Sequence, residues 1–484
     1  MKTSIVWLHS DLRIKDHPAL STASARGAVI PLWIADDAND PMWNASNSTL
    51  WWLGRSLNHL KETLRHLGTD LLVRKGTTPD VLVAVARETH ASAVYWNRPR
   101  TPRGQTTAAR VIAALKQVGV SSHECEGDLL FDPTRVARDD GTPRKIFTPF
   151  LQACLREPSP RTPIEAPRSI TRPTTWPSQE PTQEISLDDP HPSLAAIWSP
   201  GETPALAHLA TFVETGLNRY AKDRDELGFE GTSRLSPHLR FGELSPRHVW
   251  HVTNELANDN TDLIPGITAF QRQLIWREFA THVLLNQPAI EIHPMRAEYE
   301  HFPWHENKTA LEAWQHGQTG YPLVDAGMRH LAAEGWLPNR ARMVVASFLV
   351  KHLLLPWQAG ARWFWSSLVD ADPANNTLGW QWVTGSGWDA APYFRIFNPT
   401  RQSRRFDPEG IYTRQWIPEL RALPSHVLHE PSTAPATTLI NSGVTLGSTY
   451  PFPIVDHAKA RGRALQALSL IHISEPTRRT PISY

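Results

Sequence analysis

Short apolar runs of strand length alternate with helical stretches over residues 1–130, and this alternation limits the fold more than any other feature of the chain. The runs are Ile5–Leu8, Val29–Ile34, Leu71–Val73 and Val94–Trp96. Leucines recur every three or four residues from Leu50 to Leu67, which predicts a helix between the second and third runs. Thr78, directly before Pro79, is expected to cap another helix. Strands that alternate with helices predict an α/β domain built on a doubly wound parallel sheet.

A proline-rich segment separates this domain from a second one of different character. Ten of the 41 prolines lie between Pro158 and Pro200, which predicts an extended connector over residues 131–203. Residues 204–467 show one helical pattern after another without alternation of period two, so an all-α domain is expected there. The last residues, 468–484, resemble a translated sequencing adapter and are expected to be non-native.

The charge balance and the cysteine count exclude several classes of protein. The chain has 49 Lys and Arg against 48 Asp and Glu, so contact with DNA would need a local basic patch. Its two cysteines, Cys125 and Cys154, give neither a disulfide framework nor a metal-ligand spacing, and no metal is expected. No apolar run approaches the ~20 residues of a membrane span. A monomeric, cytoplasmic protein is therefore expected.

The stretch from Asp370 to Pro399 combines carboxylates, a tandem Asn pair, three tryptophans and several glycines. Glycine and asparagine at such density suggest a backbone brought close to a ligand. The stretch resembles the flavin-binding core of the photolyase and cryptochrome family. The same resemblance is seen in GTSRLSPHLRFGELSPR (231–247), QLIWREF (273–279) and GYPLVDAGMRHLAAEGWLPNRARM (320–343). It covers nearly all of residues 1–467 and implies reduced FAD as the cofactor of the all-α domain.

The resemblance implies a set of residues that bind FAD. Tyr220 and residues 232–236 are expected to hold the phosphates, while Asp370 and Asp372 hold the ribose and the ring edge. Arg342 is expected to pair with Asp370. The whole set is Tyr220, Thr232, Ser233, Arg234, Leu235, Ser236, Phe270, Gln273, Arg277, Trp336, Asn339, Arg342, Asp370, Asp372 and Asn376.

Five positions bear on catalysis through the same resemblance: Asn376, Gln273 and three tryptophans. Asn376 is expected to face flavin N5, where a neutral amide favours an anionic or fully reduced ring and hence repair. Trp380, Trp357 and Trp304 match the family's chain of tryptophans that carries electrons between the flavin and the surface.

The resemblance also implies a DNA-binding face with flat rings that stack on a flipped-out lesion. The expected contacts are Arg224, Trp276, Asn339, Arg340, Met343, Trp382, Arg395 and Arg401. Gln273 is a departure, because many enzymes that act on cyclobutane dimers have Glu there. An amide can still donate a hydrogen bond to a thymine carbonyl, and it needs no added proton to do so.

The N-terminal domain in this family often binds a second chromophore, either 8-hydroxy-deazaflavin or methenyltetrahydrofolate. The segment from Trp96 to Thr101 lacks the Glu typical of folate binders, which leaves the identity of this antenna open.

The function implied is that of a class I photolyase, which repairs cyclobutane pyrimidine dimers in DNA by light-driven electron transfer from reduced FAD. One alternative is a blue-light cryptochrome photoreceptor, disfavoured by Asn376. A second is a (6-4) photolyase, which Gln273 supports and the absence of a His near Asn339 opposes. A flavin oxidoreductase that uses NAD(P)H lacks a recognisable nicotinamide site.

Overall fold

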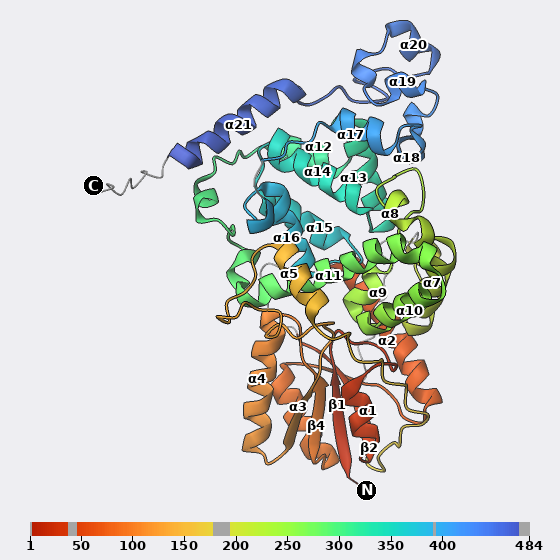
Figure 1. Ribbon diagram of the computed structural model, residues 1–484, viewed down its shortest axis with the longest axis vertical. Helices are drawn as coiled ribbons and strands as arrows, with labels where there is room; N and C mark the ends of the chain where they lie inside the picture. The colour runs from red at the N-terminus through yellow and green to blue at the C-terminus, as the bar shows by residue number, and fades with distance from the viewer. Residues whose placement is uncertain (1, 37–45, 178–193, 391–393, 474–484) are drawn as a thin grey trace, which may run out of the picture. The chain divides into compact units, whose positions relative to one another are not determined.

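The computed structural model describes residues 2–36, 46–177, 194–390 and 394–473 (Figure 1). The chain forms two compact units. The first comprises Met1–Arg224, Gly231–Pro288 and Trp365–Asn375, and the second comprises Asp225–Glu230, Ala289–Phe364 and Asn376–Tyr484. Each unit is thus assembled from segments far apart in the sequence. The boundaries expected at residues 130, 203 and 467 stay predictions.

The first unit contains a parallel sheet with the strand order β3-β2-β1-β4-β5. Its strands are β1 (Thr3–Leu8), β2 (Ala28–Ala35), β3 (Leu72–Lys75), β4 (Ala93–Asn97) and β5 (Ser121–Cys125). The doubly wound sheet is confirmed. Strand β5 was not predicted, because its sequence SSHEC is polar and it lies at the edge of the sheet, where little of it is buried.

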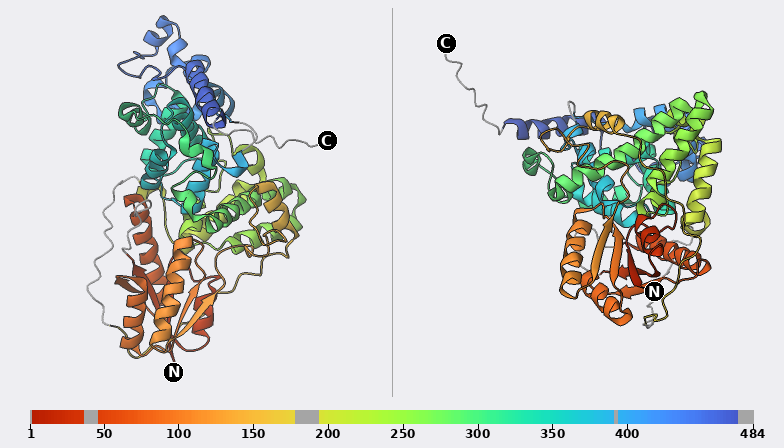
Figure 2. Two further views of the ribbon diagram at one scale, coloured as in Figure 1. Left: turned by 90° about the vertical axis from the view of Figure 1, so that its left-hand side faces the viewer. Right: turned by 60° about the horizontal axis from the view of Figure 1, so that its bottom comes forward.

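Helices flank this sheet on both sides (Figure 2). They are α1 (Pro18–Ser24), α2 (Asn47–His66), α3 (Thr78–Thr89) and α4 (Pro102–Gln117). Leu82 of α3 and Val111 of α4 pack in one buried cluster with Ile5 of β1. The expected cap of α3 was wrong by one residue, since Thr77 is the N-cap. Thr78 instead binds the Asp36 carboxylate through its amide at 3.1 Å and its hydroxyl at 2.7 Å.

The described part of the expected connector, residues 131–177 and 194–203, is mostly irregular but contains helices that were not predicted. These are α5 (Phe147–Arg156) and the one-turn α6 (Leu194–Ile197). In α5 the apolar residues Phe147, Phe150 and Cys154 recur with helical spacing and are buried. Residues 178–193 of the connector lie outside the described residues.

The rest of the first unit is helical. It comprises α7 (Glu202–Thr215), α8 (Tyr220–Asp223), α9 (Ser236–Phe241), α10 (Pro246–Asp259) and α11 (Ile264–Asn286), with 3-10 turns at Leu217–Arg219 and Thr261–Leu263. Helix α11 is long and buried over most of its length, as expected for a central helix. Gly266 lets it approach the turn Leu217–Arg219, because a Cβ there would collide with the Leu217 carbonyl.

The regular secondary structure described for the second unit consists of helices, apart from an isolated bridge between Leu446 and Tyr450. It contains α12 (Lys308–Gln315), α13 (Pro322–Glu334), α14 (Asn339–Ser347), α17 (Pro399–Phe406), α18 (Ile411–Trp416), α19 (Ser425–Leu428), α20 (Ala436–Asn441) and α21 (His457–Ile473). Short 3-10 turns lie at Pro288–Glu291, Ala297–His301, Trp388–Ala390, Pro418–Leu420 and Pro431–Thr433. Helices α15 (Trp357–Ser367) and α16 (Pro373–Thr384) each include residues of both units. The α/β domain and the all-α part together confirm the predicted fold class.

A π turn ends α14. The sequence predicted one helix from Arg340 to Leu355, whereas α14 stops at Ser347 and Phe348–His352 forms a wider π turn. Leu354 then adopts a left-handed φ of 54°. Such turns inside helical segments are frequent at functional sites.

Helix α21 continues past the start of the tail that was expected to be non-native. It ends at Ile473, and Ile471 packs with Tyr299 and Phe302 in a buried cluster. Residues 474–484 lie outside the described residues. Within the described chain, no helix is both long and apolar enough to cross a membrane.

Candidate functional site

Five charged residues form an arginine–aspartate cluster in the first unit, four of them buried and Arg240 half-buried: Arg100, Arg240, Arg277, Asp370 and Asp372. Arg100 Nη1 lies 2.7 Å from Asp372 Oδ2, with both side chains 5% exposed. This distance makes an ion pair, although it is not aligned as a good hydrogen bond. Arg240 Nε donates to the Ala371 carbonyl at 2.6 Å, and Arg277 Nη1 donates to the Asp128 carbonyl at 3.3 Å. The sequence had singled out Arg277 and both aspartates but neither Arg100 nor Arg240.

Burial and the neighbouring charges determine the pKa values of the side chains in this cluster. Burial alone would raise the pKa of the Asp372 carboxyl, but Arg100, Arg240 and the Asn375 amide hold that pKa well below its ordinary value. Burial, together with the neighbouring Arg100 and Arg277, lowers the pKa of Arg240 to about 10, although Asp372 and Asp370 act in the opposite direction. Three guanidinium groups face the two carboxylates of the cluster, and the third carboxyl group beside them, Glu278 at 3.2 Å from Arg277, has its pKa raised to about 7 by burial. A low-dielectric site of this kind favours a ligand that carries negative charge.

Asp372 also starts α16. Its Oδ1 accepts hydrogen bonds from the Asn375 amide at 2.9 Å and from Asn375 Nδ2 at 3.0 Å, which is N-cap geometry. Asn375 therefore takes part in capping its own helix. The adjacent Asn376 donates from Nδ2 to the Ala361 carbonyl of α15 at 3.1 Å, which fixes the orientation of its amide.

Four predicted site residues meet beside α11. Tyr220 and Phe270 pack edge-to-face, with ring centroids 5.3 Å apart, and the Arg224 guanidinium lies 5.5 Å from the Tyr220 ring. Arg224 Nη2 donates to Gln273 Oε1 at 3.2 Å, while Gln273 Nε2 donates to the Ala269 carbonyl of its own helix at 3.3 Å. The structure therefore gathers Tyr220, Phe270, Arg224 and Gln273 in the first unit.

The loop before α9 bends sharply at Arg234, whose φ is 49°. A Cβ at Gly231 would collide with the Asp223 backbone, so glycine is needed at the start of this loop. Ser233 Oγ accepts from the Leu235 amide at 3.4 Å, and Ser236 is the first residue of α9. A left-handed residue next to a right-handed one turns successive N–H groups towards the same side, a geometry that suits phosphate. The role of Thr232 and its neighbours in binding phosphate stays a prediction.

Trp276 stacks on Phe147 of α5, with ring centroids 3.5 Å apart and an interplanar angle of 5°. Phe147 thus covers one face of the indole, and a base could stack only on the other. The sequence had predicted the role of Trp276 but not the support that Phe147 gives it.

In the second unit, predicted residues form two groups at the start of α14. The Arg342 guanidinium lies 5.9 Å from the Trp336 ring, and its Nε donates to the Leu337 carbonyl at 2.8 Å. Asn339 Nδ2 lies 3.6 Å from Met343 Sδ, one helical turn away. The expected pairing of Arg342 with Asp370 stays a prediction.

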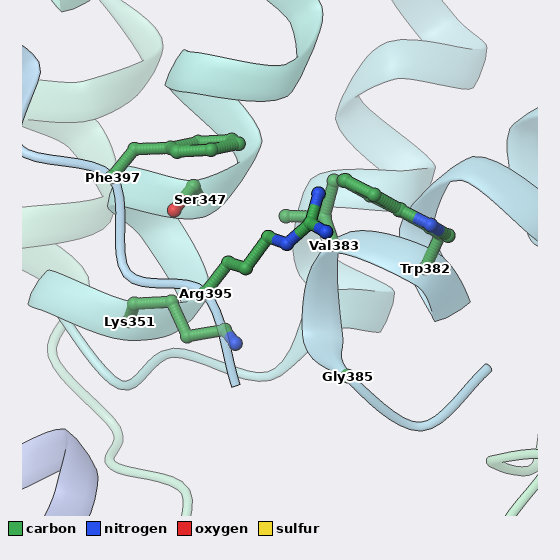
Figure 3. Close-up of a pocket in the computed structure, with 7 residues that line it drawn as sticks. All are labelled: Ser347, Lys351, Trp382, Val383, Gly385, Arg395 and Phe397. Atoms are coloured by element: carbon green, nitrogen blue, oxygen red, sulfur yellow. The ribbon is translucent and has the colours of Figure 1, made fainter. Parts of the chain in front are cut away.

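Arginines of the expected DNA face have different surroundings. Arg340 pairs with Asp225 at 2.8 Å and lies over the Phe406 ring at 4.1 Å. Arg395 is exposed, with its guanidinium 5.9 Å from the Trp382 ring (Figure 3). Arg401 is exposed in the first turn of α17, where its amide donates to Asn398 Oδ1 at 3.0 Å.

Trp380 of the predicted electron chain is buried against α15. Its ring lies edge-to-face with Phe364 at 5.1 Å, and a Cβ at Gly360 would collide with the indole. Gly360 is three residues after Trp357, so both face the same side of α15. Trp304 packs 4.3 Å from Phe302 in a cluster that includes Leu354. The three tryptophans thus belong to one unit, and electron transfer along them stays a prediction.

A small pocket lies at the carboxyl ends of β1 and β4, where the strand order of the sheet reverses. It is lined by His9, Ser10, Asn97, Arg98, Arg100 and Asp128. Doubly wound sheets bind ligands at this switch point. The presence and identity of an antenna chromophore stay predictions.

Glu278, next to the cluster, is expected to make stability depend on pH. Its carboxylate accepts from the Leu130 amide at 2.8 Å, and burial raises its pKa from an ordinary 4.5 to about 7 despite Arg277. The folded protein holds this proton while the unfolded chain has released it, so stability is lost as pH rises from about 4.5 to 7. Glu278→Gln mimics the protonated form throughout. Relative to the parent, it should gain about 3 kcal/mol between about pH 4.5 and pH 8.

Urea unfolding at both pH values measures this gain, and Glu255→Gln on the exposed side of α10 is the matched control. An equal response of the two variants to pH would contradict the assignment to Glu278.

Comparison with known proteins gives consistent matches over both parts of the chain. Residues 4–168 match the family described as DNA photolyase, and residues 270–470 match the FAD binding domain of DNA photolyase. The chain is 41% identical to a deoxyribodipyrimidine photo-lyase of Agrobacterium fabrum, over 96% of this chain and 98% of the relative. It is 36% identical to Cryptochrome-1 of Arabidopsis thaliana, over 99% of this chain and 72% of the relative.

Among solved structures, a bacterial class III photolyase from Agrobacterium tumefaciens is similar, with a TM-score of 0.93 and 40% identity over 98% of both chains. The similarity therefore extends over the sheet and the helices alike.

Proposed function

The chain belongs to the photolyase and cryptochrome family, and we propose that it is a DNA photolyase that repairs cyclobutane pyrimidine dimers with blue light and reduced FAD. The observation that carries the proposal is the face of α11, where Gln273 and Trp276 lie three residues apart and both are half-buried. This places a hydrogen-bonding amide beside an aromatic platform, as recognition of a flipped-out base requires.

The described residues fit FAD. The bend at Arg234 directs backbone N–H groups to one side for a pyrophosphate, and the arginine–aspartate cluster favours a ligand with negative charge. Tyr220 and Phe270 of the same unit would complete this part of the site in the proposal. When bound, reduced FAD would supply the light-driven electron that opens the cyclobutane ring.

The side chains on α11 would then position the lesion. Phe147 keeps the Trp276 ring in place through face-to-face stacking, and one pyrimidine packs on the open face of the indole. Arg224 holds the Gln273 carbonyl oxygen, which leaves the amide nitrogen as the donor to a thymine carbonyl. For this the amide nitrogen must give up its bond to Ala269, a weak one at 3.3 Å.

A cryptochrome photoreceptor is the second candidate, because Arabidopsis Cryptochrome-1 is similar over 99% of this chain. The neutral amide of Asn376, fixed by Ala361, favours repair. We propose repair without the class I assignment, since the similar solved structure is described as a class III photolyase. The assay described next also tests for (6-4) activity. Cytoplasmic localisation and the monomeric state stay predictions that this assay does not address.

The test uses the purified protein with reduced FAD and a duplex that contains one cyclobutane thymine dimer. Blue light is expected to restore the thymines, whereas a dark sample and a duplex with a (6-4) lesion remain unchanged. Product is measured by chromatography of the digested DNA. If FAD is bound and photoreducible but neither lesion is repaired, the photoreceptor candidate replaces this proposal.

The variant Gln273→Glu, measured in the same assay, tests whether the amide at this position is required for repair. A protonated carboxyl would keep both contacts, because its carbonyl oxygen can accept from Arg224 while its hydroxyl donates to the thymine carbonyl. Repair is therefore expected to stay within about threefold of the parent or to increase, since one hydrogen bond of similar strength replaces another. A collapse of repair would show that the Gln273 amide itself is required.

A further inference from the structure

A buried tryptophan of the connector, Trp198, contacts the loop before α9 and has no role in the repair chemistry proposed above. It follows directly after α6, is 3% exposed, and donates its amide to the Leu194 carbonyl at 2.8 Å. The Arg234 guanidinium lies 4.4 Å from the centroid of its ring. Arg234 is the residue whose φ of 49° bends this loop. Trp198 therefore contacts the loop at the point where the backbone turns.

A second tryptophan, Trp52 of α2, holds Trp198 in place. Trp52 is 0% exposed and lies edge-to-face with Trp198, with ring centroids 5.5 Å apart. The Nε1 of Trp52 donates to Glu243 Oε1 at 2.9 Å, and its ring stacks with that of Phe241 at 6.0 Å. Phe241 is the last residue of α9, and Glu243 lies two residues beyond it. Trp52 thus fixes both the indole that Arg234 contacts and the far end of the helix that follows the loop.

The connector is also fixed directly after Trp198. Gly201 packs so closely on α2 that a Cβ there would collide with the His59 ring. Glu202, the first residue of α7, accepts hydrogen bonds from two backbone amides between β1 and α1, each at 2.8 Å. Trp198 therefore occupies a defined position within the first unit, although the sequence around it suggests only an extended linker.

The bend at Arg234 needs such support. A left-handed backbone conformation is unfavourable for a residue with a Cβ and persists only where the surrounding structure holds it. A cation above an indole is attracted by the ring, and the attraction grows when water is excluded from the contact. Because the Trp198 indole is buried and fixed by Trp52, it can hold the Arg234 side chain and, with it, the backbone conformation.

We propose that Trp198 is a positioning residue of the FAD site: through Arg234 it holds the bend that turns the N–H groups of this loop towards the FAD diphosphate. Trp198 acts without touching the cofactor. The inference rests on the proposed role of the loop in binding phosphate, and it gives the connector a part in binding FAD. Affinity for oxidised FAD is measured in the dark and without DNA, so a failure of lesion repair and a failure of this inference are separate results.

The experiment compares Trp198→Leu, Trp198→Phe and the control Trp176→Leu with the parent holoprotein. Trp176 is a matched control because Arg172 lies 4.2 Å from the centroid of its ring, while the indole packs against the apolar cluster of the sheet. Serial dilution of each holoprotein releases FAD, and the rise of flavin fluorescence gives the Kd. Trp198→Leu is expected to raise the Kd about tenfold, because it loses a largely desolvated cation–π contact. Trp198→Phe keeps an aromatic face and should stay within about threefold of the parent, and Trp176→Leu should equal the parent.

A positioning role predicts two further results that a general loss of stability does not. The double variant Trp198→Leu/Arg234→Ala should bind FAD no more weakly than the weaker of the two single variants, because both substitutions break the same contact. Hydrogen exchange of the backbone amides in residues 231–241 of the full chain should become faster in Trp198→Leu and stay unchanged in Trp176→Leu.

Equal FAD affinity of Trp198→Leu and Trp176→Leu overturns the proposal. Additive losses in the double variant also overturn it, since Arg234 would then contribute to FAD binding independently of Trp198. If Trp198→Leu fails to fold, Trp198→Met takes its place in every comparison, because methionine fills the space with a longer apolar chain and likewise has no aromatic face.

Discussion

Arg100→Leu is expected to destabilise the first unit by about 3–5 kcal/mol, because it leaves a buried carboxylate without its ion-pair partner. Arg100 and Asp372 lie 2.7 Å apart, and each is 5% exposed. Asp372 also caps α16 through the Asn375 amide, so a protonated or displaced carboxyl would loosen the first turn that carries Asn376.

The chain contains a matched control two residues away. Arg98 pairs with Glu124 at 2.8 Å, but its side chain is 55% exposed, and such surface pairs contribute about 0–1 kcal/mol. Arg98→Leu should therefore shift the urea midpoint little, whereas Arg100→Leu shifts it strongly and reduces the FAD that copurifies. Equal shifts for the two variants would mean that the Arg100 pair does not stabilise the fold.

A second substitution distinguishes the effect of the unpaired carboxylate charge from the effect of the lost arginine volume. If the unpaired carboxylate causes the loss, Asp372→Asn in the Arg100→Leu background should recover part of the stability, since a neutral amide costs less to bury than a charge. The Asn375 amide would still find an acceptor in the new side chain. No recovery would instead point to the lost packing of the arginine stem.

The fold was predictable from the sequence wherever one local pattern decided the structure. Strands β1 to β4 are apolar runs, and a parallel sheet buried on both faces needs such runs. Strand β5 was not predicted, because an edge strand can be polar, as SSHEC is. The end of α14 was not predicted, because nothing in the residues from Arg340 to Leu355 marks the point where the helix widens into a π turn.

Site residues could be predicted where they belong to a sequence motif, but the residues that each of them contacts in the structure could not. Arg100 and Asp372 are 272 residues apart, and no periodicity connects them. Phe147 under Trp276 is likewise a tertiary contact between α5 and α11. Lys351 reads as an ordinary helix lysine in the sequence, but in the π turn it is 1% exposed.

Trp380→Phe is expected to slow photoreduction of bound FAD by more than about tenfold, equivalent to about 1.4 kcal/mol of barrier. Trp380 is 2% exposed and is held by Gly360 and Phe364, so a phenyl ring keeps most of the packing. A phenyl group gives up an electron far less readily than an indole does. The measurement is the loss of the visible absorbance of oxidised flavin under blue light with an external reductant present.

Trp314→Phe is the matched control, because Trp314 is equally buried and its ring lies 6.5 Å from that of Trp380. This variant loses the hydrogen bond from Nε1 to the Val345 carbonyl, so it costs stability while the predicted electron chain stays intact. Chemically reduced Trp380→Phe should still repair dimers, because in the predicted electron chain the tryptophans are needed only to reduce the flavin. Fast photoreduction in Trp380→Phe together with slow photoreduction in Trp314→Phe would move the electron path from Trp380 to Trp314.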